Sequence, residues 1–272
     1  MIEKRILLIY ILFGVMSVHS FSQPRQRIVS LAPSLTNMLY LLNAQHQIVG
    51  CTSYCEEAKK DNISVVASAI DVNVEKIFLL KPDFVVTTTL TKPSTIAALE
   101  KVGIKVNVFP SPKSYSEICN QLIEIAELTS KQVSAKNIVE KQLTRLRQLT
   151  QSIPKGKKPK LFFQIGAKPI FTVIPNTFMD DYISYAGCEN IASDLKSGTI
   201  SRESVIVRNP DVIVVVTMGI VGAEEKTVWQ GYQNITASKN GKIFIVDSNQ
   251  ACSPDPVNFV DVVELLITKI YK

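Results

Sequence analysis

Two glutamates occupy the same place in a unit that the chain contains twice. Glu75 stands in NVEKIFLLKPDFVVTT and Glu203 in SRESVIVRNPDVIVVV, each seven residues before a Pro-Asp pair. The dipole of a helix stabilises a carboxylate in its first turn, and Asn73 or Ser201 is placed to cap that helix. By residue type alone these are either two structural carboxylates or two anionic contact points.

Thiols and imidazoles are the other groups that could do chemistry, and they are sparse. The five cysteines form no C-x-x-C knuckle, and one of the two histidines, His19, lies in an N-terminal leader. The chain contains no nucleophile elbow, P-loop or dinucleotide-binding fingerprint. The sequence therefore predicts no metal site and no enzyme.

Two of the cysteines, Cys55 and Cys252, leave two interpretations open. Cys55 follows the second expected strand and Cys252 follows the last, so the two loops are expected to reach the cleft from opposite lobes. They are either unrelated buried or rim residues, since free cysteine is commonly buried, or a pair close enough to form a disulfide or to coordinate a metal carried by a ligand.

The N-terminus has the order of charges and apolar residues that is typical of an export signal. Lys4 and Arg5 precede an apolar run from Ile6 to Val18, which is shorter than the roughly 20 residues that cross a bilayer. We expect residues 1–22 to be a signal peptide cleaved near Ser22; an uncleaved anchor is the alternative. No cysteine follows the apolar run to carry a lipid.

The composition is that of a folded chain without a nucleic-acid surface. Of 272 residues, 46% are hydrophobic and 20% are charged, with a formal net charge of +6. Positive charge is dense only in KGKKPK (155–160), where no aromatic residue stands ready to stack on a base. We predict no nucleic-acid partner and read this stretch as a solvated loop.

Strands and helices alternate in both halves of the chain, which predicts parallel sheets covered on both faces. RIVSLAP begins the first half, with Ser34 placed to cap the helix that follows, and Pro82 ends the helix that contains Glu75. Residues 114–153 show no strand pattern, and apolar residues at helical spacing predict one long amphipathic helix over 131–153. The expected fold is α/β: two Rossmann-like lobes (23–130 and 154–272), joined by this backbone helix, with the ligand cleft between them.

An ordered set of stretches resembles one family of proteins. RIVSLAPSLTNMLYLL, VGCTSYC, NVEKIFLLKPDFVV, LEKVGIKV, FFQIGAKPIFTV, AGCENIASD, SRESVIVRNPDVIVV and KIFIVDS are similar to the cobalamin-binding family of periplasmic binding proteins, whose lobes are joined by a backbone helix (class III). The resemblance implies a periplasmic, monomeric solute-binding component of an ABC importer. It also implies that Glu75 and Glu203 dock on arginines of the inner-membrane permease.

The resemblance further implies a transported corrinoid (cobalamin or a relative) and no prosthetic group. Ligands of such sheets lie outside the carboxyl ends of the strands. The predicted ligand-binding residues are Pro33, Ser34, Tyr54, Cys55, Gly166, Lys168, Phe171, Met218, Asp247 and Cys252.

Ligand identity stays open at this point. The cobalamin receptor surrounds its ligand with several tryptophans, whereas this chain has one, Trp229, in a helix-like stretch where packing is expected. Tyr54 either stacks on a flat ligand or covers a loop. A haem or ferric-siderophore receptor is the alternative within the same fold, and a scaffold that contacts a protein without any ligand is a further possibility.

Overall fold

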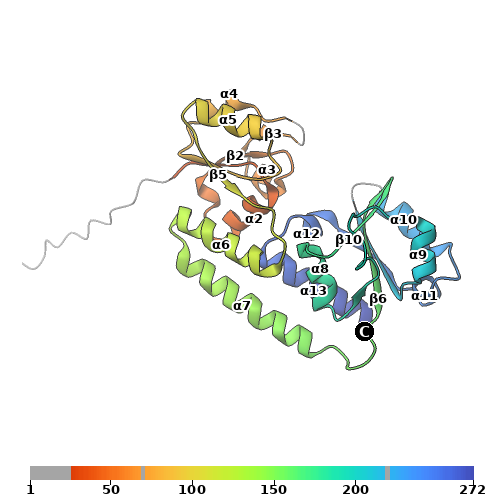
Figure 1. The fold of residues 1–272 in the computed structure, drawn as a ribbon. Coiled ribbons are helices and arrows are strands. Elements are labelled where there is room, and N and C mark those ends of the chain that lie inside the picture. Colours follow the sequence, from red (N-terminus) through yellow and green to blue (C-terminus); the bar gives the residue numbers. More distant parts are fainter. Residues whose placement is uncertain (1–25, 69–70, 218–220) are drawn as a thin grey trace, which may run out of the picture.

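The first half of the chain folds into a parallel five-stranded sheet. The computed structural model describes residues 26–68, 71–217 and 221–272 (Figure 1). The strand order is β3-β2-β1-β4-β5, all parallel. Its strands are β1 (Ile28–Ser30), β2 (Ile48–Thr52), β3 (Ser64–Ala67), β4 (Phe84–Thr88) and β5 (Lys105–Phe109), and its helices are α2 (Pro33–Leu41), α3 (Glu56–Lys60), α4 (Val74–Leu79) and α5 (Pro93–Lys101), with a 3-10 turn η1 (Gln45–Gln47).

The second half folds into a sheet of order β10-β9-β6-β7, with β8 also pairing with β6. The strand β7 runs antiparallel to β6, an edge hairpin that the strand and helix alternation did not predict. Its strands are β6 (Lys160–Ala167), β7 (Ile170–Thr172), β8 (Glu189–Asn190), β9 (Val212–Thr217) and β10 (Ile243–Asp247), and its helices are α8 (Phe178–Tyr185), α9 (Arg202–Arg208), α10 (Val221–Gln230), α11 (Thr236–Lys239) and α12 (Ser248–Cys252).

Three longer helices connect the lobes: α6 (Tyr115–Thr129), α7 (Gln132–Gln151) and α13 (Pro256–Tyr271). The 20 residues of α7 correspond to about 30 Å, and Figure 1 shows this helix running below both lobes. Ser130, with a left-handed φ of 57°, separates α7 from α6. The sequence did not predict α6 as a separate helix. The division of the chain into lobes at residues 130 and 154 stays a prediction.

One hydrophobic core runs through both lobes. Alternate residues of the strands supply it, among them Phe84 and Val86 of β4. Where the lobes meet, Phe259 of α13 stacks against Tyr115 of α6 and Tyr182 of α8, with ring centroids 4.4 and 4.5 Å apart. The other face of each sheet has a core of its own, covered by α4 and α5 in the first lobe and by α9 and α10 in the second.

The repeated unit has the same start in both lobes. The Asn73 side chain accepts a hydrogen bond from the amide of Lys76, and that of Ser201 accepts one from the amide of Ser204. Both helices therefore begin with the predicted cap. The first helix differs: α2 starts at Pro33, which is favoured at an initial helical position, and Ala32 stands at the cap, so the prediction that Ser34 caps this helix was wrong.

The aspartate of the Pro-Asp pair makes an equivalent hydrogen bond in both lobes. A carboxylate oxygen of Asp83 accepts a hydrogen bond from the amide of Arg27 at 2.7 Å, and Asp211 accepts one from the amide of Lys160 at 2.8 Å. Each aspartate thus fixes the beginning of the first strand of its lobe beside the strand that it precedes. No helix of the described residues has both the length and the apolar character needed to cross a membrane.

Candidate ligand-binding cleft

The first lobe carries a cavity of about 510 Å³ at the carboxyl ends of its strands. Hydroxyl groups dominate its lining, with one carboxylate, Asp71, and one ammonium, Lys92. Leu90, in the loop after β4, is 85% exposed beside these polar groups. The hydroxyl-bearing residues of the lining are Thr52, Ser68, Thr88, Thr91, Ser94 and Thr95 together with Tyr54.

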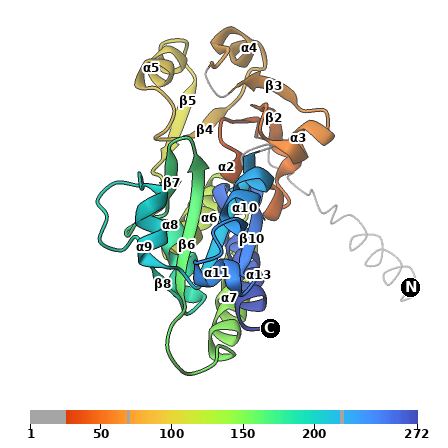
Figure 2. The same cartoon turned by 90° about the vertical axis from the view of Figure 1, so that its right-hand side faces the viewer.

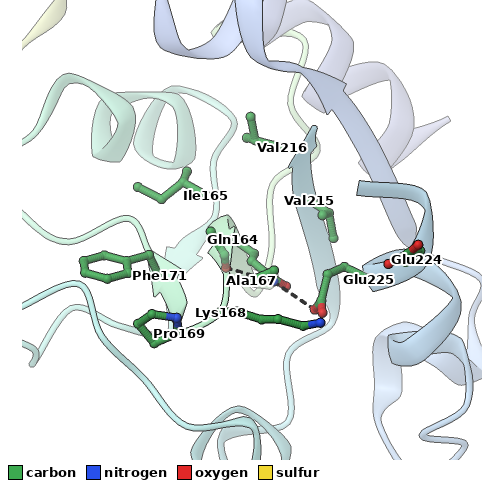
Figure 3. A pocket seen from close by; sticks show the side chains of 11 residues that line it. Gln164, Ile165, Ala167, Lys168, Pro169, Phe171, Val215, Val216, Glu224 and Glu225 are labelled. Atoms are coloured by element: carbon green, nitrogen blue, oxygen red, sulfur yellow. Dashed lines mark hydrogen bonds between the residues drawn. The ribbon is translucent and has the colours of Figure 1, made fainter. Parts of the chain in front are cut away.

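The second lobe carries a cavity of about 480 Å³, again at the carboxyl ends of strands. Figure 3 shows Lys168, Pro169 and Phe171 on the β6–β7 hairpin and Glu225 on the facing helix α10. The hairpin extends toward the first lobe (Figure 2), so this cavity lies on the side from which a ligand between the lobes would be reached. Its walls are mostly apolar, with carboxylates at one side.

A buried polar network lies behind this second cavity. The Gln164 amide nitrogen donates to Glu225 at 2.9 Å, and the Trp229 indole donates to the Gln164 oxygen at 2.7 Å. Arg202 forms an ion pair with Glu225 at 2.9 Å and lies 4.4 Å above the Trp229 ring. The other terminal nitrogen of Arg202 is buried without a hydrogen-bond partner among the described residues. The expected packing role of Trp229 is confirmed by its complete burial.

A third cavity, of about 480 Å³, is formed jointly by the two lobes. Pro33 and Tyr54 line it from the first lobe, and both also line the first cavity. Asn249, Gln250 and Asn258 line it from α12 and α13 of the second lobe. The predicted cleft between the lobes is therefore a real hollow, and Tyr54 stands where two of its parts meet.

The predicted ligand-binding residues fall into three groups. Pro33, Tyr54, Gly166, Lys168 and Phe171 line the cavities, whereas Ser34, Cys55, Asp247 and Cys252 do not, and Met218 lies outside the described residues. All ten stay predictions as ligand contacts. Asp247 is exposed and caps α12 through the amide of Asn249.

Cys55 lies under the cleft rather than in it. Its sulfur is 3.1 Å from the Thr36 hydroxyl and 3.2 Å from that of Thr52. Hydrogen bonding from Cys51 and from these hydroxyls lowers the pKa of the Cys55 thiol. Both Cys55 and Cys252 are free, the former buried and the latter exposed, so the interpretation of the two as a disulfide was wrong.

Several residues of the cleft were missed by sequence reasoning. Leu90 is a single leucine in a polar loop, and only its position directly after a strand could have drawn attention to it. Gln164 and Glu225 are brought together by the fold across 61 residues, and no local pattern relates them. The sequence offers one indication of this part of the cleft: Glu224 and Glu225 are two adjacent carboxylates that follow a buried strand.

The charges around the three cavities are unlike those of the whole chain, which is basic. Among the residues that line them, none is an arginine. The lining carboxylates are Glu56, Glu57, Asp71, Glu224, Glu225 and Asp255, and the lining ammonium groups are Lys60, Lys92 and Lys168. Within the part of the chain that the structure describes, no three His, Cys, Asp or Glu residues are grouped as metal ligands.

Two α/β lobes around a cleft, joined by long helices, define a solute-binding protein of the transport type. A family model described as periplasmic binding protein matches residues 28–250, and the chain belongs to this family. Members of the family capture substrates for ABC transporters; the chain is thus a binding protein and not an enzyme. It has a small-molecule ligand and a permease partner.

Relatives with different ligands share this fold. The chain is 29% identical over 258 residues to the uncharacterized ABC transporter substrate-binding lipoprotein YvrC of Bacillus subtilis, covering 90% of this chain and 80% of the relative. It is 30% identical over 200 residues to the vitamin B12-binding protein of Yersinia pestis, covering 71% and 70%. The periplasmic heme-binding protein HutB of Vibrio cholerae superposes with a TM-score of 0.80 at 21% identity, covering 91% and 100%.

Proposed function

We propose that the protein captures a corrinoid in the cleft and delivers it to an inner-membrane ABC permease. The observation that carries the choice of ligand is the absence of arginine from the residues that line the three cavities, where Asp71 and Glu224 form no ion pair among the described residues. The similarity to a vitamin B12-binding protein supports the same choice.

The reason lies in the groups at the periphery of each ligand. A corrinoid carries primary amides, which donate hydrogen bonds to carboxylates and hydroxyls. Haem carries carboxylates, and these would meet Glu224 and Asp71 without a guanidinium to pair with. Like charges brought together in a partly desolvated cleft disfavour binding.

The apolar surfaces of the cleft suit the flat part of such a ligand. Tyr54, Leu90 and Phe171 are all exposed, and they come from both lobes. Ligand sites in general combine apolar faces with a few polar groups that fix orientation. We therefore propose Tyr54, Lys168 and Phe171 as ligand contacts, and add Leu90 and Glu224.

Haem is the second candidate because of Tyr54. A phenol oxygen is a known axial ligand of ferric haem, and this one lies in the cleft. The superposition on a heme-binding protein is compatible with this alternative.

A titration separates the two candidates. The purified mature protein is mixed with cyanocobalamin, dicyanocobinamide, haemin or a ferric hydroxamate, and absorbance is recorded. We expect saturable binding of the corrinoids and a modest loss of affinity in Tyr54→Phe, since the ring remains. Saturable binding of haemin alone, with the spectrum altered in Tyr54→Phe, would reject the corrinoid assignment.

Delivery is assigned to the two repeated glutamates. Glu75 and Glu203 are exposed, and neither forms an ion pair among the described residues, so both carboxylates are available to cations of a partner. Carboxylates on separate lobes engage two positive patches only when the lobes are correctly placed. The Glu75→Lys/Glu203→Lys protein should bind the solute normally and fail in uptake by cells; unchanged uptake would make these glutamates purely structural.

Export belongs to the same proposal. We infer a periplasmic monomer that has lost residues 1–22. N-terminal sequencing of protein recovered from the cell envelope should start near Ser22, and retention of the leader in the membrane fraction would instead support an uncleaved anchor.

A further inference from the structure

Exposed apolar side chains stand beside both of the glutamates assigned to docking. Leu79 lies four residues after Glu75 and is 77% exposed, and Val207 lies four residues after Glu203 and is 84% exposed. Phe78, next to Leu79, is also exposed. Single exposed apolar residues are ordinary on a protein surface, but equivalent ones at equivalent positions of two lobes are not explained by that background.

Helix geometry places each apolar residue on the same face as its glutamate. Residues four apart are neighbours on a helix surface. The inward faces of the two helices are occupied by Ile77 and Val205, which are fully buried in the cores of their lobes. Leu79 and Val207 therefore point away from the core, and packing inside the lobe does not account for them.

The backbone around the two residues is also alike. Each helix ends in a left-handed residue, Lys81 with φ 47° and Asn209 with φ 46°, and a Pro-Asp pair follows. The two helices α4 and α9 lie on the sides of their lobes that are distant from α7 (Figure 1). The chain thus presents one carboxylate with an apolar neighbour twice, in the same local geometry.

We propose that these residues form two docking pads, Glu75-Phe78-Leu79 on α4 and Glu203-Val207 on α9, which bury their apolar side chains against the permease. The inference rests on the proposed delivery role and deepens it. The occupant is a membrane protein with two like sites, each offering a cation beside an apolar recess. The repetition of the pads favours this partner, as do the two exposed carboxylates, neither of which forms an ion pair among the described residues.

The two components of a pad have separate tasks. Carboxylates steer the encounter, and their effect weakens as salt screens it. Buried apolar area stabilises the complex once it has formed and is insensitive to moderate salt. Docking should consequently retain a salt-resistant component, and that component should disappear when the apolar side chains are removed.

A first experiment identifies the partner in cells. A photo-crosslinking phenylalanine analogue is placed at position 79 or 207, and at position 133 as control, since Val133 on α7 is 75% exposed but has no docking glutamate in its helix turn. We expect crosslinks from 79 and 207, but not from 133, to a permease of the ABC class. Crosslinks only to a second copy of this chain would overturn the proposal, as would the absence of any permease adduct.

A second experiment measures the contribution of the pads. The permease identified by crosslinking is purified without a crosslink, together with its ATPase, in nanodiscs. The affinity of the ligand-free Leu79→Ser, Val207→Ser and Val133→Ser proteins for this complex is then compared with that of wild type at two salt concentrations. Each pad variant should lose about tenfold in affinity at both salt concentrations, while Val133→Ser stays unchanged. Wild-type affinity in both pad variants would overturn the proposal.

Failure of the ligand assignment would be distinguishable from failure of the pads. The corrinoid titration is repeated on the same variants, and all should bind like wild type because the pads lie outside the cleft. If no variant and no wild type binds a corrinoid, the ligand is wrong, and the docking measurement, made without ligand, still decides the pads.

Discussion

The residue before Glu75 differs from the residue before Glu203, although the units around the two glutamates are alike. Val74 precedes Glu75 and packs against the core of its own lobe. Arg202 precedes Glu203, and its guanidinium reaches Glu225, which lines the cleft. A polar connection between α9 and the cavity is therefore present in the second lobe, while in the first lobe the same position is apolar.

The cavities near these two units also differ in the residues that line them. The cavity of the first lobe is lined mainly by hydroxyl groups and by the exposed Leu90, whereas that of the second has a mostly apolar wall backed by a buried ion pair and Trp229. The outer half of each unit thus has the same cap and the same Pro-Asp contact in both lobes. The cavities behind the two units, by contrast, have different linings.

The largest effect is expected where the lobes are joined. Phe259→Ala removes the ring that stacks on Tyr115 and Tyr182, and a cavity in this shared core should lower the free energy of unfolding by about 4 to 5 kcal/mol. Urea unfolding is followed by Trp229 fluorescence, which reports the second lobe, and by circular dichroism, which reports both. The two probes should coincide in wild type; separate transitions would show that the lobes are independent units.

The ion pair of the second lobe is the next most sensitive point. Glu225→Gln leaves the Arg202 guanidinium without its charge partner and should cost about 3 to 4 kcal/mol. Glu225→Met with Arg202→Met should recover much of this loss, because neither charge then remains buried. Asp194→Asn, which disrupts the exposed pair with Arg208, is the control and should have a far smaller effect. Equal losses at both sites would show that burial does not set the Arg202–Glu225 pair apart from the more exposed pair of the same lobe.

A pH dependence should come from the carboxylate between the lobes. Burial raises the pKa of Asp255 to about 6 from an ordinary 3.8, so the folded protein holds this proton more tightly than the unfolded chain does. Its stabilising contribution, about 3 kcal/mol, is present below about pH 4 and is lost as the pH rises through about 6. In Asp255→Asn, which retains a capping side chain, the difference in stability between pH 4 and pH 7 should shift by this amount.

An unchanged pH profile in Asp255→Asn would show that the carboxylate does not titrate in this range. The control for capping is the stability of Asp255→Asn and wild type at pH 4, where both side chains are uncharged in the folded protein. The two proteins should be about equally stable there, since asparagine and aspartate cap helices about equally.

The smallest effects should be equal in the two lobes. Asn73→Ala and Ser201→Ala each remove one cap and should each cost about 1 kcal/mol in chemical unfolding, since each side chain satisfies one free amide at a helix start. A clear difference between the two losses of stability would indicate that the two caps contribute unequally to folding despite their common geometry.

Much of the fold was predictable because the signals are local. The continuous apolar run VIVVV specifies β9, and FVVTT, whose residues are β-branched after the phenylalanine, specifies β4. The helix predicted over 131–153 is present as Gln132–Gln151. The break between α6 and α7 was not predictable, because Ser130 adopts a left-handed conformation without being glycine. The β6–β7 hairpin was missed because β7 has only three residues.

The cleft was predictable only in part, for a related reason. Tyr54, Lys168 and Phe171 were found because they follow strands, and the carboxyl ends of parallel strands meet at one edge. The contact of Arg202 with Glu225 depends on two helices from different parts of the sequence packing against one sheet, so no spacing rule contains it. Cys55 illustrates the converse, since a loop position near the cleft does not determine that its thiol turns inward.

We propose that the three cavities, whose described lining residues include no arginine, select a corrinoid over an anionic iron complex. The most direct test of this proposal is a titration of the mature protein with cyanocobalamin and haemin in parallel, with absorbance and melting temperature recorded together. We expect saturable binding of cyanocobalamin and a rise in melting temperature, because a ligand that binds the folded state stabilises it. Stabilisation by haemin and none by cyanocobalamin or cobinamide would contradict the claim.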